Sequence, residues 1–220
     1  MKKLIFLSIV SLFASCSQQR AIQNPEKVTE AASAVEEAAE IINAETEIRD
    51  FQNELIDEWN NPETTPLHEE EKADFKGITF FPVDLKYRIN ADFKPIKDGK
   101  TLPFPTSANK IKYFKEYGKA TFTLDSKQFE LTLYQSDPPH TEDDESLFLP
   151  FMDETGGETS YGGGRYLDLY ISDIKNGKIL IDFNQAYNPY CAYSNYYNCP
   201  IPPANNYLET EIRAGVSYQQ

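Results

Sequence analysis

A glycine-rich segment contains the first residues whose spacing points to chemistry. Five of the ten glycines fall between Gly156 and Gly164, and Arg165 follows them directly. Successive backbone amides in such a loop can form an anion-binding nest, which an arginine can complete with a bidentate pair of hydrogen bonds. The segment has neither the Gly-Lys-Ser/Thr of a phosphate-binding loop nor the βαβ context of a dinucleotide fingerprint. A wide turn that leads into a strand is the alternative.

Two aspartates form a second group. Asp168 alternates with apolar residues in 165–171, and Asp182 does so in 178–184. If these two strands pair as a hairpin around Asn176-Gly177, both carboxylates can lie on one face. Two carboxylates beside one pocket can act as an acid and a base or hold a cation. The alternative is a pair of solvated side chains that contact Arg or Lys.

Residues 183–208, called the uncharged segment below, contain no Asp, Glu, Lys or Arg. Five of the 14 tyrosines lie between Tyr187 and Tyr197, among many Pro and Asn residues. Proline and asparagine favour loops, whereas tyrosine rings and asparagine amides make adaptable recognition surfaces. We predict an ordered loop that lies across the body, either as part of a binding site or as a lid that packs the end of a barrel.

Cys191 and Cys199 lie within the uncharged segment. In an oxidising compartment a disulfide between them is the simplest interpretation. A catalytic thiolate would need a base such as His140. We predict no metal site and no cofactor, because His68 and His140 are the only histidines and a second cysteine pair is lacking.

These features define a predicted small-ligand site, while no catalytic residue is assigned. Its residues should converge on one concave pocket. They are Glu158, Tyr161, Gly162, Gly163, Gly164, Arg165, Asp168, Asp182, Asn184, Tyr187 and Asn188.

Alternation of apolar and polar residues indicates the strands that must position this site. Residues 119–135 alternate on both sides of a polar turn at Asp125 and predict a β-hairpin. Further strands are predicted at 78–83, 85–91, 111–117, 147–151, 165–171, 178–184 and 207–213. Such frequent strands predict a mainly β fold, an antiparallel barrel or sandwich, in a single domain at 45–220.

An amphipathic helix should precede this domain. Ile48, Phe51, Leu55 and Trp59 form one stripe at helical spacing, and Asn60-Asn61-Pro62 should end the helix. The stripe should dock on the body, with binding to a partner as the alternative. Residues 16–44 are predicted to be a tether, in which the Ala- and Glu-rich stretch 30–40 forms a solvated helix.

The first sixteen residues resemble an export signal. Lys2 and Lys3 precede an apolar run at 4–13, which is too short to span a bilayer, and Ala14-Ser15-Cys16 follows. This end resembles a bacterial lipobox, with Phe13 where Leu is usual. The resemblance implies a signal peptide at 1–15, lipidation of Cys16 with diacylglycerol, and N-acylation such as palmitate. An ordinary signal peptide is the alternative.

Charge and composition restrict the partners. The formal net charge of −14 argues against nucleic-acid binding, because phosphate contacts need clustered Lys and Arg. The mature chain should attach to the lipid bilayer through its acyl chains rather than through a basic patch. No acidic residue follows Cys16 until Glu26, so we expect a lipid-anchored protein of the bacterial cell envelope that faces the periplasm.

Several of these segments resemble the bacterial family known as domain of unknown function 1684. The similarity covers roughly 45–218 and departs at Asn205, where the family pattern has Glu. The resemblance implies a mainly β domain that often occurs in lipoproteins and has no assigned reaction or cofactor. The family also includes members without export signals, whose cysteines would stay reduced in the cytosol, and this argues against the disulfide interpretation. The motifs lie at 147–155, 158–167, 182–189, 191–193, 199–205 and 214–215.

Two functions are compatible with these observations. The first is a membrane-anchored binding module or envelope accessory protein that holds a small polar or anionic ligand. The second is a hydrolase-like enzyme that uses Arg165 with Asp168 and Asp182, or Tyr161. A purely structural role is a third possibility. No nucleophile–base pair can be recognised from spacing alone.

Overall fold

The computed structural model describes residues 25–218, with side chains from residue 33 onward. The predicted signal peptide 1–15 and the predicted lipidation site Cys16 lie outside this range. The chain divides into two units, residues 1–41 and 42–220, and each is described by itself. No helix among the described residues is long and apolar enough to cross a bilayer.

Helix α1 extends from Pro25 to Asn60 and belongs to both units. In the first unit, residues 33–41 are exposed, as their low content of bulky apolar residues predicts. In the second unit, Ile48 is fully buried and Trp59 is buried against Phe75 and Tyr193, so the predicted stripe docks on the body. A four-residue helix, α2 (Glu69–Lys72), follows.

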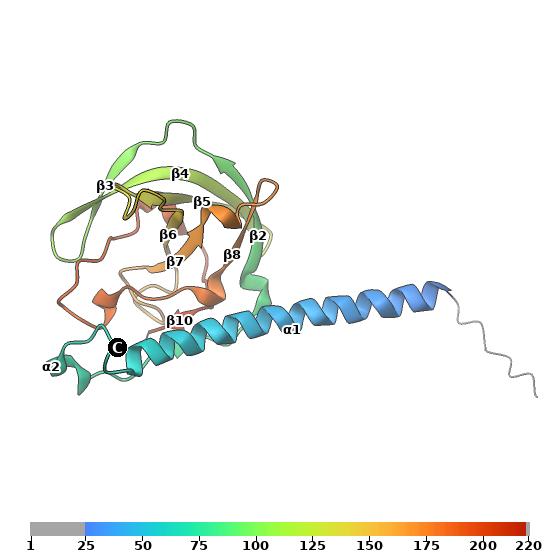
Figure 1. Ribbon diagram of the computed structural model, residues 1–220, viewed down its shortest axis with the longest axis horizontal. Helices are drawn as coiled ribbons and strands as arrows, with labels where there is room; N and C mark the ends of the chain where they lie inside the picture. Colours follow the sequence, from blue (N-terminus) through green and yellow to red (C-terminus); the bar gives the residue numbers. More distant parts are fainter. Residues whose placement is uncertain (1–24, 219–220) are drawn as a thin grey trace, which may run out of the picture. The chain divides into compact units, whose positions relative to one another are not determined.

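The body is a mainly antiparallel sheet that curls into a half-barrel (Figure 1), which confirms the predicted fold class. Its strand order is β7-β6-β5-β4-β2-β8, while β3 pairs with β4 and β9 pairs with β6 in parallel. β1 and β10 form a separate pair. The strands are β1 (Thr79–Phe80), β2 (Arg88–Pro95), β3 (Thr101–Pro105), β4 (Ile111–Leu124), β5 (Lys127–Ser136), β6 (Ser146–Asp153), β7 (Arg165–Tyr170), β8 (Lys178–Asp182), β9 (Tyr207–Leu208) and β10 (Val216–Ser217).

The β4–β5 hairpin lies where the alternation predicts it. Asp125 and Ser126 form its two-residue turn with φ of 47° and 66°, as a type I′ connection requires. A β-bulge between Glu116 and Gly118 interrupts the β4–β5 register. Because a bulge adds one residue to one strand, it reverses which face the following side chains occupy.

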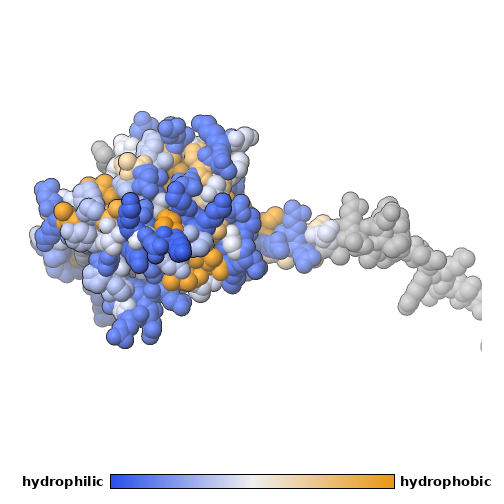
Figure 2. Space-filling view, turned by 90° about the horizontal axis from the view of Figure 1, so that it is seen from above, coloured by the Kyte–Doolittle hydropathy of each residue, from blue (hydrophilic) through white to orange (hydrophobic). Residues whose placement is uncertain are grey.

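Two apolar clusters result, one on each face of the sheet. The larger contains Ala120 and Phe122 from β4 and the alternating Leu147, Leu149 and Phe151 of β6. The smaller contains Phe104, Phe114 and Tyr134, with Leu102 and Phe148 against them. The strands therefore bury aromatic side chains on both faces. The surface in Figure 2 is largely hydrophilic, with scattered apolar side chains.

Candidate functional site

Arg165 is buried and does not line either of the cavities described below. Its side chain is 1% exposed, and one guanidinium nitrogen lies 3.0 Å from Oδ2 of Asp153, itself 2% exposed. The guanidinium also donates to the carbonyl oxygens of Ala214 (2.5 Å) and Ile212 (2.8 Å). Arg165 therefore fastens the C-terminal segment to β6 and cannot complete an anion-binding nest.

The glycine-rich segment has a structural role at its last residue. Gly164 has φ of 87°, and a Cβ there would lie 2.5 Å from Pro202 and 2.8 Å from the carbonyl of Phe151. Only glycine fits this backbone and this close approach. Of the other candidates in this loop, Gly162 and Glu158 are exposed and Gly163 is half-buried. Tyr161 donates to the carbonyl of Cys191 at 3.3 Å.

The predicted hairpin between β7 and β8 is wrong. Asn176 and Gly177 do form a tight turn, with φ of 54° and 71°, but a short 3-10 helix at Ile171–Asp173 separates this turn from β7. β8 instead pairs with β2, and β7 pairs with β6. Curling of the sheet, rather than a hairpin, brings its two edge strands toward one cavity.

Asp182 and Asn184 are part of the framework of this region. Asp182 accepts a hydrogen bond from Arg88 at 2.6 Å, and Arg88 also binds Glu47 of α1 at 2.5 Å. Asn184 is 1% exposed, and its side-chain amide accepts a hydrogen bond from the backbone N–H of Asp84 and donates one to the Asp84 carbonyl. Since Asp182 pairs with Arg88 and Arg165 pairs with Asp153, the combination of Arg165 with two aspartates does not exist here.

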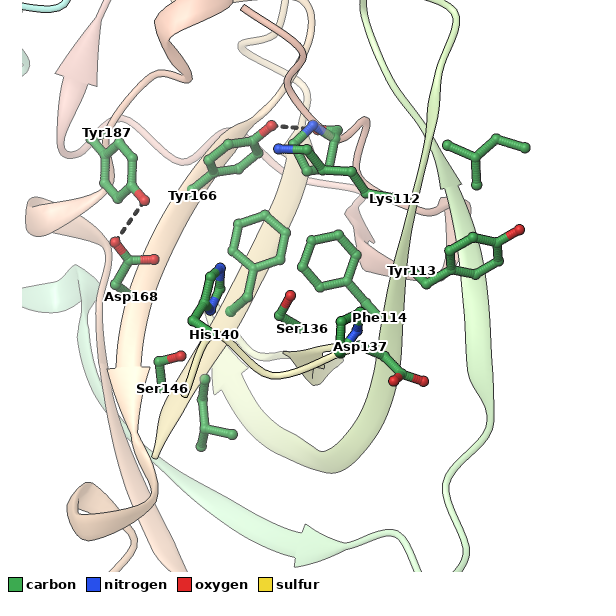
Figure 3. A pocket seen from close by; sticks show the side chains of 15 residues that line it. Lys112, Tyr113, Phe114, Ser136, Asp137, His140, Ser146, Tyr166, Asp168 and Tyr187 are labelled. Carbon is green, nitrogen blue, oxygen red and sulfur yellow. Dashed lines mark hydrogen bonds between the residues drawn. The ribbon is translucent and has the colours of Figure 1, made fainter. Parts of the chain in front are cut away.

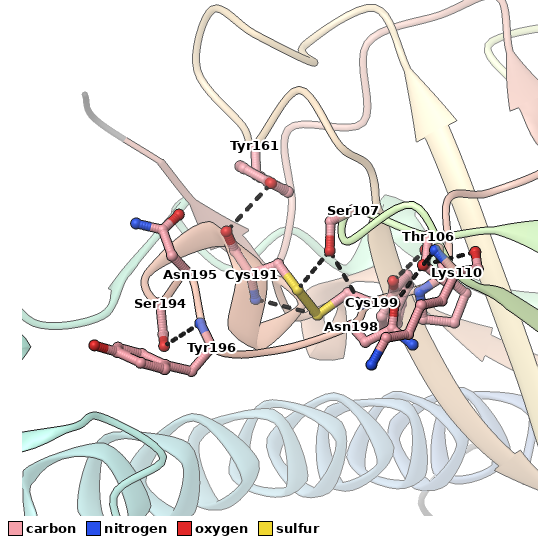
Figure 4. The surroundings of a disulfide bond; sticks show 12 residues. Thr106, Ser107, Lys110, Tyr161, Cys191, Ser194, Asn195, Tyr196, Asn198 and Cys199 are labelled. Carbon is pink, nitrogen blue, oxygen red and sulfur yellow. Dashed lines mark hydrogen bonds between the residues drawn. A yellow bond between two sulfur atoms is a disulfide. The ribbon is translucent and has the colours of Figure 1, made fainter.

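The uncharged segment is an ordered loop on the body. Cys191 and Cys199 form a disulfide with an S–S distance of 2.10 Å (Figure 4). Beside it, the backbone N–H of Cys199 donates to Ser107 Oγ, and that of Ser107 donates to the carbonyl of Cys199. Tyr197 and Tyr190 donate to the carbonyl of Pro66 and to Glu58. The segment thus connects the β3–β4 turn with the end of α1.

Asp168 and Tyr187 form the most exposed polar pair among the predicted residues. Tyr187 Oη donates to Asp168 Oδ2 at 2.7 Å, and the backbones of Tyr187 and Tyr166 exchange two hydrogen bonds of 2.9 and 3.0 Å. The start of the uncharged segment is thereby fixed to β7. Both Asp168 and Tyr187 line two neighbouring cavities.

The first of these, called the aromatic cavity below, has a volume of about 530 Å³ (Figure 3). Rings from four elements line it, and the Asp168–Tyr187 bond lies at one side of it in Figure 3, away from Tyr113 and Asp137. Its aromatic residues are Tyr113, Phe114, Phe148, Tyr166 and Tyr187, and its polar residues include Lys112, Ser136, Asp137, His140, Ser146 and Asp168.

The second, called the polar cavity below, has a volume of about 790 Å³ between β7, β8 and residues of α1. Charged groups of both signs line it. They are Glu47, Arg88, Asp168, Asp173, Lys175, Lys178 and Asp182. Asp168 and Asp182 therefore line one cavity although their strands are not paired, whereas most of the other predicted site residues line neither cavity.

Burial controls the protonation of the pair. Loss of water around the carboxylate raises the pKa of Asp168, and the hydrogen bond from Tyr187 opposes this effect only in part. Burial, followed by the nearby Asp168 charge, raises the pKa of Tyr187 well above its ordinary value. Tyr187 therefore remains a hydrogen-bond donor at neutral pH.

A Ser–His–Asp group at the rim of the aromatic cavity does not have the order of a catalytic triad. Asp144 lies in the middle, with Oδ1 accepting from Ser146 at 2.5 Å and Oδ2 lying 3.0 Å from His140 Nδ1. A triad needs the histidine between the other two. These hydrogen bonds, that of Ser146 first, lower the pKa of Asp144 and stabilise the loop. Within the described residues no cluster of His, Cys, Asp or Glu is suited to a metal ion.

A family model described as "Protein of unknown function (DUF1684)" matches residues 73–217. The chain belongs to this family. The motif resemblance found in the sequence is thereby confirmed. This DUF1684 chain is also similar to an uncharacterized protein of Haloarcula marismortui solved by solution NMR, with 32% identity, a TM-score of 0.64, and coverage of 82% of this chain and 97% of that one. The search of curated proteins found no match.

Several cavity residues of this DUF1684 domain were not among the predicted site residues. Phe114, Phe148 and Tyr166 form the aromatic wall. The alternation in 165–171 places Tyr166 on the same face as Asp168, and this signal was present in the sequence. Nothing in the sequence brings Phe114 to them, because the bulge in β4 decides its face. Asn188 is buried and donates to Tyr193, outside both cavities.

Proposed function

We propose that this protein is a lipid-anchored lipoprotein of the bacterial cell envelope whose β domain binds a small polar ligand beside Asp168 and Tyr187. The observation that carries the binding role is the Asp168–Tyr187 pair, because an accessible carboxylate and a hydroxyl lie together between two cavities. Ligand sites are typically concave and largely apolar, with a few convergent polar groups, and volumes of about 300–1,000 Å³ are usual.

The anchoring role rests on different observations. The lipobox-like sequence at Ala14-Ser15-Cys16 supports lipidation. The Cys191–Cys199 disulfide supports an oxidising compartment, where such bonds persist. Anchoring by acyl chains is consistent with the acidic composition of the chain, which disfavours attachment to anionic headgroups.

Two experiments test the two halves of the proposal. Cys16→Ala should release the protein from membranes in cell fractionation, and a variant that remains in the membrane fraction would contradict the anchor.

For the ligand, the detergent-purified full chain is screened against a metabolite library by thermal shift. A true ligand at 100 times its Kd stabilises the fold by about 2.7 kcal/mol, and Asp168→Asn should abolish that stabilisation.

A further inference from the structure

Asp168 differs from the buried carboxylates of this protein because it lacks a cationic partner. Asp153 pairs with Arg165 at 3.0 Å, and Asp182 pairs with Arg88 at 2.6 Å. Among the described residues, no Lys, Arg or His lies within ion-pair distance of Asp168, and Tyr187 is the only side chain that donates to it. Asp168 is exposed toward the two cavities that it lines, so its carboxylate is accessible to a cation that enters them.

A continuous row of aromatic rings leads to this carboxylate. The ring centroids of Phe114 and Phe148 are 5.0 Å apart, those of Phe148 and Tyr166 are 4.8 Å apart, and those of Tyr166 and Tyr187 are 5.9 Å apart. The faces of such rings carry partial negative charge and attract ammonium groups, above all alkylated ones. The row and the unpaired carboxylate line the same aromatic cavity.

The basic side chains that line the cavity make no contact with Asp168. His140 is bound to Asp144. Lys112 comes from β4 and lines the cavity on the side of Tyr166 (Figure 3), but it makes no ion pair with Asp168. A positively charged ligand would therefore supply the cationic partner that Asp168 lacks within the described residues.

We infer that the aromatic cavity binds an organic ammonium ion, with its alkyl groups against the rings of Phe148 and Tyr166 and its positive charge beside the carboxylate of Asp168. This inference rests on the proposed ligand-binding function and names the ligand class of the same site. It replaces the anionic ligand expected from the glycine-rich loop, since Arg165 is turned into the core. An aromatic cavity with an unpaired carboxylate favours an ammonium ion over a neutral polar molecule, which would leave the carboxylate uncompensated.

The first test needs no variant. The full chain is titrated with choline and with its neutral carbon isostere 3,3-dimethylbutan-1-ol, at constant ionic strength, by calorimetry or NMR. Choline should bind saturably, and the isostere at least ten times more weakly. Equal affinities, or no choline binding at all, would overturn the inference.

Variants then locate the binding. Asp168→Asn and Phe148→Ala should each weaken choline binding at least tenfold, and Lys112→Met should strengthen it by removing a like charge. Glu130→Gln is the matched control, because Glu130 pairs with Lys119 on the surface and neither residue lines either cavity. Circular dichroism checks that each variant is folded. Unchanged affinity in folded Asp168→Asn would refute the inference.

The two proposals fail in different ways. If a neutral or anionic library compound binds in an Asp168-dependent manner and ammonium compounds do not, the ammonium inference is wrong and the binding function stands. If no compound binds beside Asp168, both are wrong. Phosphatidylcholine vesicles form a separate arm, which uses the Cys16→Ala variant because acyl chains alone would hold the wild type on any bilayer. Tighter binding of this variant to the vesicles than to free choline, lost in Cys16→Ala/Asp168→Asn, would identify a lipid headgroup as the source of the ammonium ion.

Discussion

Tyr187 donates a hydrogen bond of 2.7 Å to Asp168, and this contact joins the uncharged segment to an edge strand of the half-barrel. The tyrosine hydroxyl is the only side-chain donor to the carboxylate among the described residues. One hydrogen bond compensates only part of the cost of removing a carboxylate from water. The pair therefore holds a charge that the fold does not neutralise.

Replacement of Asp168 by Asn should increase stability at neutral pH. Because the pKa of Asp168 is raised, the folded state binds the proton more tightly than the unfolded state. The contribution of Asp168 to wild-type stability therefore falls as pH rises from the ordinary pKa of 3.8 through the raised value. The variant should have a higher urea midpoint than wild type at pH 7.5, and the difference should vanish near pH 3.5. A variant less stable than wild type at pH 7.5 would contradict this prediction.

Removal of Arg165 should be strongly destabilising. Arg165→Ala leaves Asp153 buried without its cation, which typically costs about 3–5 kcal/mol. The carbonyls of Ala214 and Ile212 lose their donor as well. Urea unfolding measures the change. Arg213→Ala is the control, because the exposed Arg213–Glu211 pair should contribute only about 0–1 kcal/mol. Similar losses of stability in the two variants would contradict the structural role of Arg165.

Asn206 should matter much more than its neighbour Asn205. Asn206 is fully buried, donates to the carbonyls of Thr132 and Pro150 at 2.8 Å each, and accepts from the N–H of Thr132 at 2.9 Å. Asn206→Ala leaves these backbone groups unpaired, at about 1–3 kcal/mol for each group. Asn205→Ala, at an exposed position, should cost about 1 kcal/mol or less. Denaturant unfolding distinguishes the two, and equal losses would contradict this role.

Loss of the Cys191–Cys199 disulfide should lower stability by about 2.5 kcal/mol, as expected for closing a short loop in the chain-entropy model. The measurement compares oxidised wild type with Cys191→Ser/Cys199→Ser in urea. Reductant should bring wild type to the level of the double variant and leave the variant unchanged. A reductant effect on the double variant would show that the loss has another cause.

Much of the fold is determined by local sequence patterns. Alternating residues predict β4, β5, β6, β7 and β8, because one face of each strand must be buried. The helical stripe from Ile48 to Trp59 predicts docking of α1, and Asn60 ends the helix as expected. The missed strands are β3, whose two prolines argue against a strand although Leu102 and Phe104 alternate, and β10, whose two residues are too few for a pattern.

Only the tertiary structure decides what the predicted site residues do. Arg165 and Asp168 are three residues apart on one strand, yet their odd spacing sends one side chain into the core and the other toward the cavities. The sequence predicts a functional role for both Arg165 and Asp168, because their charges and their positions beside the glycine-rich segment can be read from it. Which of the two charges is neutralised depends on residues from other parts of the chain. Arg165 forms an ion pair with Asp153, whereas Asp168 accepts a hydrogen bond from Tyr187 and has no cationic partner among the described residues. Long-range packing, which no local pattern encodes, separates the structural ion pair from the accessible carboxylate.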